Sequence, residues 1–344
     1  MNQEIISQIS AKRSIHLDII AGIMIIYMVL YHCSQWSNTT NSLIMRILER
    51  GLFFFMPWFF FKAGLFFKKN KKLNAYIQSS SKRLIIPFLV YTILAMPVYT
   101  VSLILINNFN FSVFLKDQLA SLLYCGSVPA NLPLWFLPTL FAVRIIAKVT
   151  SIINIKLCLL GGGIAMVLNY INFHYPLWIP NICSGLFFFS LGYLLNNIQY
   201  RKVTFIISTC IYIAAFAYPS IVDLRCNSLH SGNYALWLIF STCGCIVFNN
   251  IFLHISTYSL IFKPFQIAGE NSMFIYASHW IIFFLLKISL TSLEISLTDY
   301  QRFILYITVM TLSYALFFVF HKRISHKKNI CVEALSLKMF LKKR

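Results

Sequence analysis

Two ionisable side chains lie in one apolar segment near the start of the chain. Residues 17–36 form a run long enough to cross a membrane, with Asp18 at its beginning and His32 near its far end. A charge and an ionisable ring inside such a segment are costly and are rarely kept without a partner or a function. On a straight helix the two are about 21 Å apart along the axis and within about 40° of one face. They therefore cannot touch each other, but they can line one inward-facing seam.

Each of the two residues has a chemical and a purely structural explanation. A neutral His32 imidazole can take a proton from an attacking hydroxyl, and its ordinary pKa of about 6.5 suits work at neutral pH. The same ring can instead do no more than bond to a group at the outer membrane interface. Asp18 can contribute to the chemistry, or it can be a carboxylate favoured by the dipole at a helix N-terminus. Composition and spacing alone leave both explanations open.

The composition is that of an integral membrane protein. The 344 residues are 59% hydrophobic and only 11% charged, whereas a soluble domain has about 25% charged residues. No polar stretch is long enough for a separate soluble domain, so residues 1–344 are expected to form one membrane domain with a basic tail at about 322–344. The nine cysteines show neither metal-ligand spacing nor a disulfide framework, and no metal site is expected.

The apolar runs predict an all-α, polytopic helical bundle of about ten transmembrane helices. The net charge of +20 gathers in short runs between alternate spans, such as 68–72 and 82–83, which places both chain ends in the cytoplasm. Because the positive charge is divided among these short runs, the chain has no solvated basic face on which nucleic acid could bind. Segment 107–132 is expected to be a loop or a short surface helix. The predicted spans are approximately 17–36, 51–67, 84–106, 133–149, 157–172, 182–198, 203–222, 234–253, 273–290 and 303–321.

Five stretches, taken in order, resemble one family. The first is the helix with Asp18, Gly22 and His32. The others are FFFMPWFFFKAGLFFKK at 53–69, SKRLIIP at 81–87, PLWFL at 133–137 and GENSMFIYASHWII at 269–282. No single stretch is specific, but together they cover most of the chain and resemble the membrane acyltransferase 3 family.

The resemblance implies an enzyme of the bacterial cytoplasmic (inner) membrane. Members take an acyl group, usually acetyl, from cytoplasmic acyl-CoA and pass it to a hydroxyl of a glycan or glycolipid of the envelope. The family histidine falls on His32, which would act either as general base or as a transient acyl carrier. The basic-loop arginine falls on Arg83. Arg83 and Lys82 can hold the phosphates of coenzyme A, or they can be ordinary anchors at the cytoplasmic surface.

The chain departs from the family pattern at Ala21, where many members carry a basic residue eleven positions before the histidine. Lys62 is expected at a similar depth on the antiparallel second span, so it is a candidate to supply the missing charge. It can also be a lysine that extends toward the cytoplasmic interface. Arg144, near the inner end of the fourth span, is a second candidate.

Three further residues are candidates for substrate binding. Tyr276 and His279 lie near the cytoplasmic end of a late span, and counting residues puts His279 roughly 10 Å closer to the cytoplasm than His32. Direct contact between the two imidazoles is therefore expected only if a helix tilts or breaks. His279 can face the acyl donor, or it can simply bond to a neighbouring helix. Trp135 can line the site or belong to the aromatic belt at the interface.

Two other classes of membrane protein compete with this interpretation. A transporter or flippase of lipid-linked sugars is expected to have paired halves or a cation-lined cavity, and the sequence has no internal repeat. A glycan polymerase of similar size usually places its working residues in large outer loops, but the outer loops here are short apart from 107–132. The residues do not determine the acceptor, the acyl chain or the oligomeric state.

Overall fold

The structure is a computed structural model that describes residues 15–151, 154–168, 176–196, 202–217, 234–255 and 260–319. All regular elements in these ranges are helices, as the sequence predicts, and the basic tail at 322–344 lies outside them. The elements are α2 (Ile15–Trp36), α3 (Leu43–Leu52), α4 (Phe55–Leu65), α5 (Leu73–Ser80), η1 (Ser81–Ile85), α6 (Ile86–Leu105), α7 (Phe111–Cys125), η2 (Pro129–Trp135), α8 (Phe136–Thr150), α9 (Ile155–Leu168), α10 (Trp178–Leu195), α11 (Lys202–Ala217), α12 (Tyr234–Ile255), α13 (Lys263–Glu270), α14 (Ser272–Ser292) and an unlabelled helix, Asp299–Val319.

Seven of the described helical segments are long and apolar enough to cross a membrane. Their outward faces are apolar too, and Ile93 on α6, for example, is 68% exposed. A soluble protein rarely exposes such a continuous apolar surface to water. The chain is therefore a multi-pass membrane protein. Each of the ten predicted spans coincides with a described helix, but several of these helices are shorter than a bilayer, so ten crossings remain a prediction.

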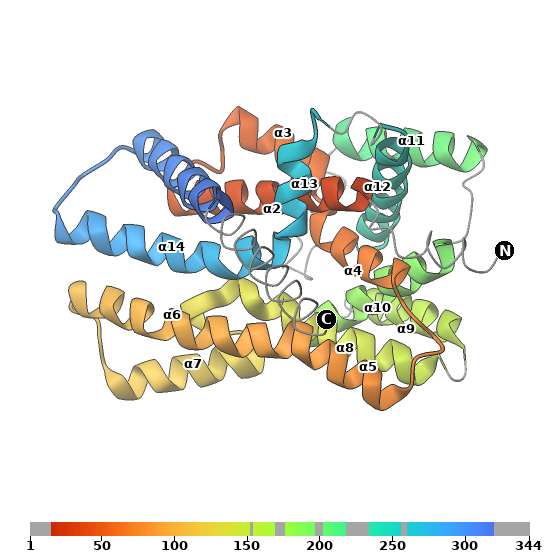
Figure 1. The fold of residues 1–344 in the computed structure, drawn as a ribbon, viewed down its shortest axis with the longest axis horizontal. Coiled ribbons are helices and arrows are strands. Elements are labelled where there is room, and N and C mark those ends of the chain that lie inside the picture. The colour runs from red at the N-terminus through yellow and green to blue at the C-terminus, as the bar shows by residue number, and fades with distance from the viewer. Residues whose placement is uncertain are drawn as a thin grey trace, which may run out of the picture.

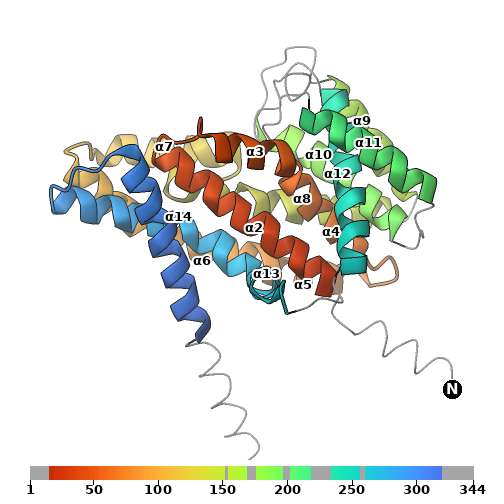
Figure 2. The ribbon, with the colours of Figure 1, turned by 90° about the horizontal axis from the view of Figure 1, so that it is seen from above.

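The helices do not form a simple parallel stack. In Figure 1, α6, α7 and α14 lie together at one end of the molecule, and α9 to α12 lie at the other, with α2 and α4 between them. Figure 2 shows α3 and α7 along one edge and α5 and α13 along the opposite edge. The first residues of α2 and the last of the helix Asp299–Val319 also lie at the α5 and α13 edge. Both described ends of the chain thus lie on one side of the molecule.

Helices α2 and α13 cross at very close range, at two glycines. A Cβ atom at Gly22 would overlap the carbonyl oxygen of Phe265, and one at Gly269 would overlap the carbonyl oxygen of Asp18. Small residues are what allow two helix backbones to approach this closely in a membrane protein. The crossing holds the start of α14, directly after α13, against the first turns of α2.

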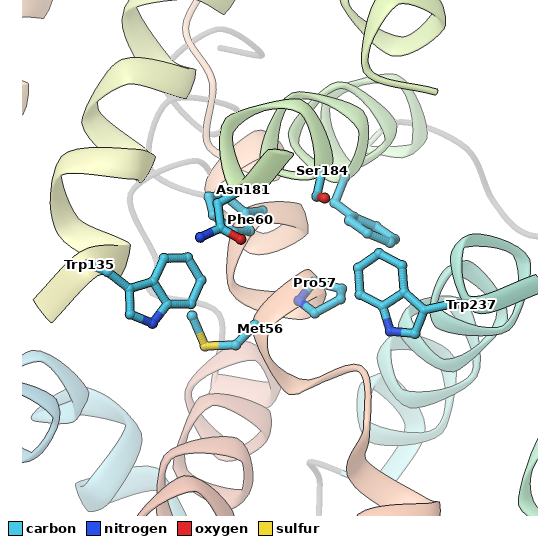
Figure 3. A pocket seen from close by; sticks show the side chains of 8 residues that line it. Met56, Pro57, Phe60, Trp135, Asn181, Ser184 and Trp237 are labelled. Carbon is cyan, nitrogen blue, oxygen red and sulfur yellow. The ribbon is translucent and has the colours of Figure 1, made fainter. Parts of the chain in front are cut away.

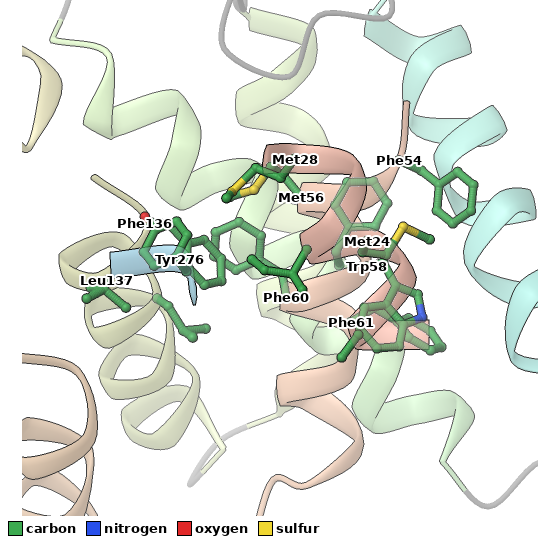
Figure 4. Close-up of a cluster of buried hydrophobic side chains, with 14 of the residues drawn as sticks. Met24, Met28, Phe54, Met56, Trp58, Phe60, Phe61, Phe136, Leu137 and Tyr276 are labelled. Atoms are coloured by element: carbon green, nitrogen blue, oxygen red, sulfur yellow. The ribbon is translucent and has the colours of Figure 1, made fainter. Parts of the chain in front are cut away.

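Aromatic side chains fill the core between α2, α4, α8 and α10, as Figure 4 shows. Because lipid is as apolar as these side chains, close packing rather than expulsion of water stabilises them. Glycines permit that packing on α4 and α10: a Cβ atom at Gly64 or Gly192 would overlap a backbone carbonyl of the facing helix. The completely or almost completely buried members include Trp58, Phe61, Phe188 and Phe189.

Candidate active site

The rings of His32 and His279 are in contact. Their centroids are 5.3 Å apart and their planes are inclined by 23°, so the imidazoles are stacked. Trp280 lies edge-on to His32 at the same centroid distance of 5.3 Å. His279 is completely buried, and His32 is partly exposed. The predicted difference in depth between the two imidazoles is therefore wrong, and they meet as expected only for a tilted or broken helix.

The reason lies in where α14 begins. Equal depth for equal residue counts holds only for upright helices that start at a common membrane boundary. In the structure α13 crosses α2 at Gly22, and α14 starts from that crossing. His32 is ten residues beyond Gly22, and His279 is ten residues beyond Gly269. Because α14 starts at the crossing and lies beside α2, its residue His279 reaches His32.

Hydrogen bonds indicate which nitrogen of each ring carries a proton. His279 Nδ1 is 2.7 Å from the carbonyl oxygen of Tyr276. A carbonyl only accepts, so Nδ1 donates, and in the neutral ring Nε2 keeps its lone pair. That Nε2 is buried and has no hydrogen-bond partner among the described residues. His32 Nδ1 is 2.8 Å from Gln35 Oε1, which favours the same tautomer there. Gln35 lies on the same helix face as His32 but is not among the residues that the sequence singled out.

A break between α7 and α8 lies against the start of α14. Asn131 in η2 is completely buried, has the non-helical backbone angles φ −153° and ψ 71°, and donates from Nδ2 to the carbonyl oxygen of Ala277 at 3.0 Å. The Tyr276 hydroxyl donates to the carbonyl oxygen of Pro133. Tyr276 and Trp135, two candidate substrate-binding residues, therefore both belong to the junction between η2 and α14. Tyr276 helps to hold this junction together through its hydrogen bond. Irregular backbone within a membrane protein must be buried in protein or line a cavity.

Asp18 and Lys62 form an ion pair at the other end of α2. Lys62 Nζ is 3.4 Å from Asp18 Oδ1 and 3.1 Å from the carbonyl oxygen of Leu17, and it lies over the Trp58 ring. This agrees with the expected depth of Lys62, one turn from Ala21. The pair lies beside the α13 crossing and, as the spacing along α2 predicts, far along the helix from His32.

The predicted basic residues gather at the α5 edge of the molecule. Lys82 and Arg83 are exposed in η1, a π-helical turn in the otherwise continuous helix 73–105. Arg144 donates from Nε to the Tyr76 hydroxyl at 3.3 Å, and its guanidinium is 5.1 Å from the Tyr76 ring centroid. Lys148, which the sequence did not single out for the site, lies 5.9 Å from the same ring. Lys148 is buried and donates to the carbonyl oxygen of Lys69, whereas the other three residues (the basic edge: Lys82, Arg83 and Arg144) can hold an anion such as a phosphate.

A small pocket lies between α4, η2, α10 and α12, and Figure 3 shows its walls. Its volume is about 270 Å³, counting the part open to the outside. Most of that space is open to the outside, and the enclosed part has room for about one water molecule, so coenzyme A cannot enter. Trp135 is one wall residue, but neither histidine of the pair is. The lining residues are Met56, Pro57, Phe60, Trp135, Asn181, Ser184, Phe188 and Trp237.

Comparison with known proteins gives one match. No curated protein and no solved structure matches the chain. Within the described ranges no three metal-ligating side chains come together. A family model described as an acyltransferase domain matches residues 15–322, which is most of the chain and includes both histidines of the pair. The protein therefore belongs to the acyltransferase 3 family.

Proposed function

We propose that this membrane acyltransferase moves an acyl group, most simply acetyl, from cytoplasmic acyl-CoA to a hydroxyl of a cell-surface polysaccharide or of its lipid-linked precursor. The observation that carries the proposal is the stacked pair of His32 and His279. It gathers two imidazoles inside a helical bundle whose family transfers acyl groups. The membrane would be the bacterial cytoplasmic membrane.

His32 is the proposed reacting group because its ring is partly exposed and its Nε2 can hold a lone pair while Nδ1 bonds to Gln35. As a base, Nε2 takes the hydroxyl proton while the new C–O bond forms and the C–S bond of the thioester breaks. As a carrier, Nε2 first attacks the acyl carbon and releases coenzyme A as a thiolate. Both routes need an unprotonated Nε2, and no metal is required to activate a thioester.

The donor is proposed to bind through its phosphates at the basic edge, where Arg83, Lys82 and Arg144 provide charge-assisted hydrogen bonds. Under the topology indicated by the basic loops, this edge faces the cytoplasm, where acyl-CoA is made. Lys62 is proposed to supply the positive charge that Ala21 lacks, held in place by Asp18.

A transporter of lipid-linked glycans is a second candidate, and one observation favours it. The break at η2 resembles the discontinuous helices that form binding sites in many transporters. Transport moves a glycolipid across the membrane without breaking a thioester, so the two candidates predict different products.

Purified protein in lipid nanodiscs, given acetyl-CoA labelled in the acetyl group and an extract of envelope glycans, tests the proposal. We expect free thiol to appear only with the extract and the label to enter the glycan fraction. A heat-denatured sample is the blank. The absence of both thiol release and glycan labelling would contradict the acyltransferase, and movement of a labelled glycolipid across proteoliposomes without thiol release would favour the transporter.

A further inference from the structure

Helix α3 lies between α2 and α4 in the chain and is too short to cross a membrane. Its 10 residues, Leu43–Leu52, measure about 15 Å along the axis, which is half of a hydrocarbon core of roughly 30 Å. In Figure 2, α3 runs along one edge of the molecule together with α7, on the side opposite to α5 and α13. Under the predicted topology this edge is the outer face. Helix α3 is therefore a surface helix at the outer membrane interface.

Two kinds of side chain share the outward side of α3. Leu43, Ile44 and Ile47 are 69%, 69% and 47% exposed. Arg46 and Arg50 are four positions apart, so their side chains are neighbours on one face of the helix. Each arginine also follows an exposed apolar residue by three positions, and residues three apart are neighbours too. An apolar stripe and a basic stripe therefore lie side by side on the outward surface of α3.

The charge of the basic stripe is not used within the protein. Met45 is the buried residue of α3, and Glu49, the one acidic residue of this helix, lies one turn further on the Met45 side. Arg46 and Arg50 make no hydrogen bond or ion pair with any residue that the structure describes. Both guanidinium groups therefore keep their donors for a partner outside the protein.

A hydrogen-bonded turn joins α3 to the helix that carries His32. The Thr39 amide donates to the carbonyl oxygen of Ser34 at 2.9 Å. Asn38 has a left-handed backbone, with φ 58°, which asparagine adopts more readily than most residues. The Ser42 side chain caps the first turn of α3 by accepting from a backbone amide. Because α2 ends four residues beyond His32, this turn sets the position of α3 relative to the proposed reacting imidazole.

A lipid that carries phosphate groups matches the two stripes. Arginine forms paired, charge-assisted hydrogen bonds with phosphate, and exposed leucine and isoleucine side chains of an interfacial helix pack against hydrocarbon chains. Basic residues on the outer side run against the usual charge distribution of membrane proteins, so they need another role. We propose that α3 binds the phosphate groups of a lipid-linked acceptor and packs its apolar stripe against the lipid chain. This inference rests on the proposed function and selects the lipid-linked precursor as the acceptor, since its glycan would then lie at the end of α2 that carries His32.

The test measures equilibrium binding of radiolabelled farnesyl diphosphate, a hydrocarbon chain with two phosphates, to the full chain in phosphatidylcholine nanodiscs. The competitors are farnesol (chain without charge), inorganic diphosphate (charge without chain) and phosphatidylglycerol (an ordinary anionic phospholipid). The test variants are Arg46→Gln and the double variant Arg46→Gln/Arg50→Gln. Arg302→Gln is the matched control, because Arg302 lies outside α3 and donates to the carbonyl oxygen of Leu297. Arg83→Gln detects binding of the probe at the basic edge instead.

We expect the parent chain to bind the probe, with a dissociation constant about fivefold higher in Arg46→Gln and at least about twentyfold higher in the double variant. Arg302→Gln and Arg83→Gln should bind like the parent chain, and no competitor should displace the probe at equal concentration. Failure of the parent chain to bind would overturn the inference, as would binding that only Arg83→Gln weakens. Equal displacement by phosphatidylglycerol would also overturn it, because the occupant would then be an ordinary phospholipid.

Measurement of thiol release in the same nanodiscs, with an extract of lipid-linked glycans, separates the two proposals. Probe binding through the arginines of α3, without thiol release or glycan labelling, refutes the proposed function only. Acyl transfer with an unchanged KM for the lipid-linked glycan in the double variant refutes the lipid site only.

Discussion

Replacement of Lys62 by methionine should destabilise the protein, because it leaves the Asp18 carboxylate without its ammonium partner. At the observed separation of 3.4 Å, two unit charges attract by about 5 kcal/mol at an effective dielectric constant of 20, before the cost of removing them from water. Loss of one partner of a buried pair typically costs about 3–5 kcal/mol. The Lys62 side chain is 20% exposed and that of Asp18 is 7% exposed, and the carboxylate that remains in the variant can take up a proton. We therefore expect a loss near the lower end, about 3 kcal/mol.

The assay is a denaturant unfolding titration in mixed micelles, with the double variant Asp18→Asn/Lys62→Met as the key comparison. The double variant removes both charges and should recover most of the lost stability. Lys71→Met is the control and should cost less than about 1 kcal/mol, because among the residues that the structure describes the Lys71 ammonium bonds only to the Ser79 hydroxyl. A double variant as unstable as Lys62→Met would refute the ion-pair reasoning. If the double variant is stable but inactive in acyl transfer, the charge of Lys62 or that of Asp18 is needed for chemistry as well; full activity would exclude both roles.

Three further changes have defined outcomes. Gly269→Ala should prevent the α2 and α13 crossing and abolish both folding yield and activity, since its Cβ would overlap the carbonyl oxygen of Asp18. Gly161→Ala has open space at its Cβ and should behave like the parent chain in size-exclusion chromatography. Arg83→Gln should raise the KM for acetyl-CoA about tenfold and leave kcat nearly unchanged, because one phosphate contact is lost before the chemical step; a fall in kcat alone would contradict a binding role. Tyr276→Phe should lower the free energy of unfolding by about 1–3 kcal/mol, because the Pro133 carbonyl loses its donor; an unchanged midpoint in the same titration would contradict the junction described at η2.

Features that depend on counting residues along one helix could be predicted from the sequence. The helical class, the location of the apolar segments and the wide separation of Asp18 and His32 along α2 follow from apolar runs and helix geometry. The nearness of Lys62 to the first turns of α2 also follows, because two antiparallel neighbours keep a fixed register. The roles of these residues in acyl transfer remain predictions.

Features that depend on how helices cross could not be predicted in the same way. The contact between His32 and His279 requires α14 to start at the Gly22 and Gly269 crossing rather than at a membrane boundary. The bond from Asn131 to Ala277 joins residues 146 positions apart, and no local pattern marks it. The one available signal was the prolines on either side of Asn131, which indicate a break in the helix without saying what it packs against.

The rate of acetyl-CoA-dependent thiol release by His32→Gln in nanodiscs, with glycan extract present, tests the central claim most directly. We expect a loss of at least about 100-fold relative to the parent chain, since the base or carrier is gone. His254→Gln, at an exposed histidine on α12, should keep nearly the full rate. A folded His32→Gln protein that releases coenzyme A and labels the glycan at the parent rate would show that the imidazole at position 32 is not the reacting group.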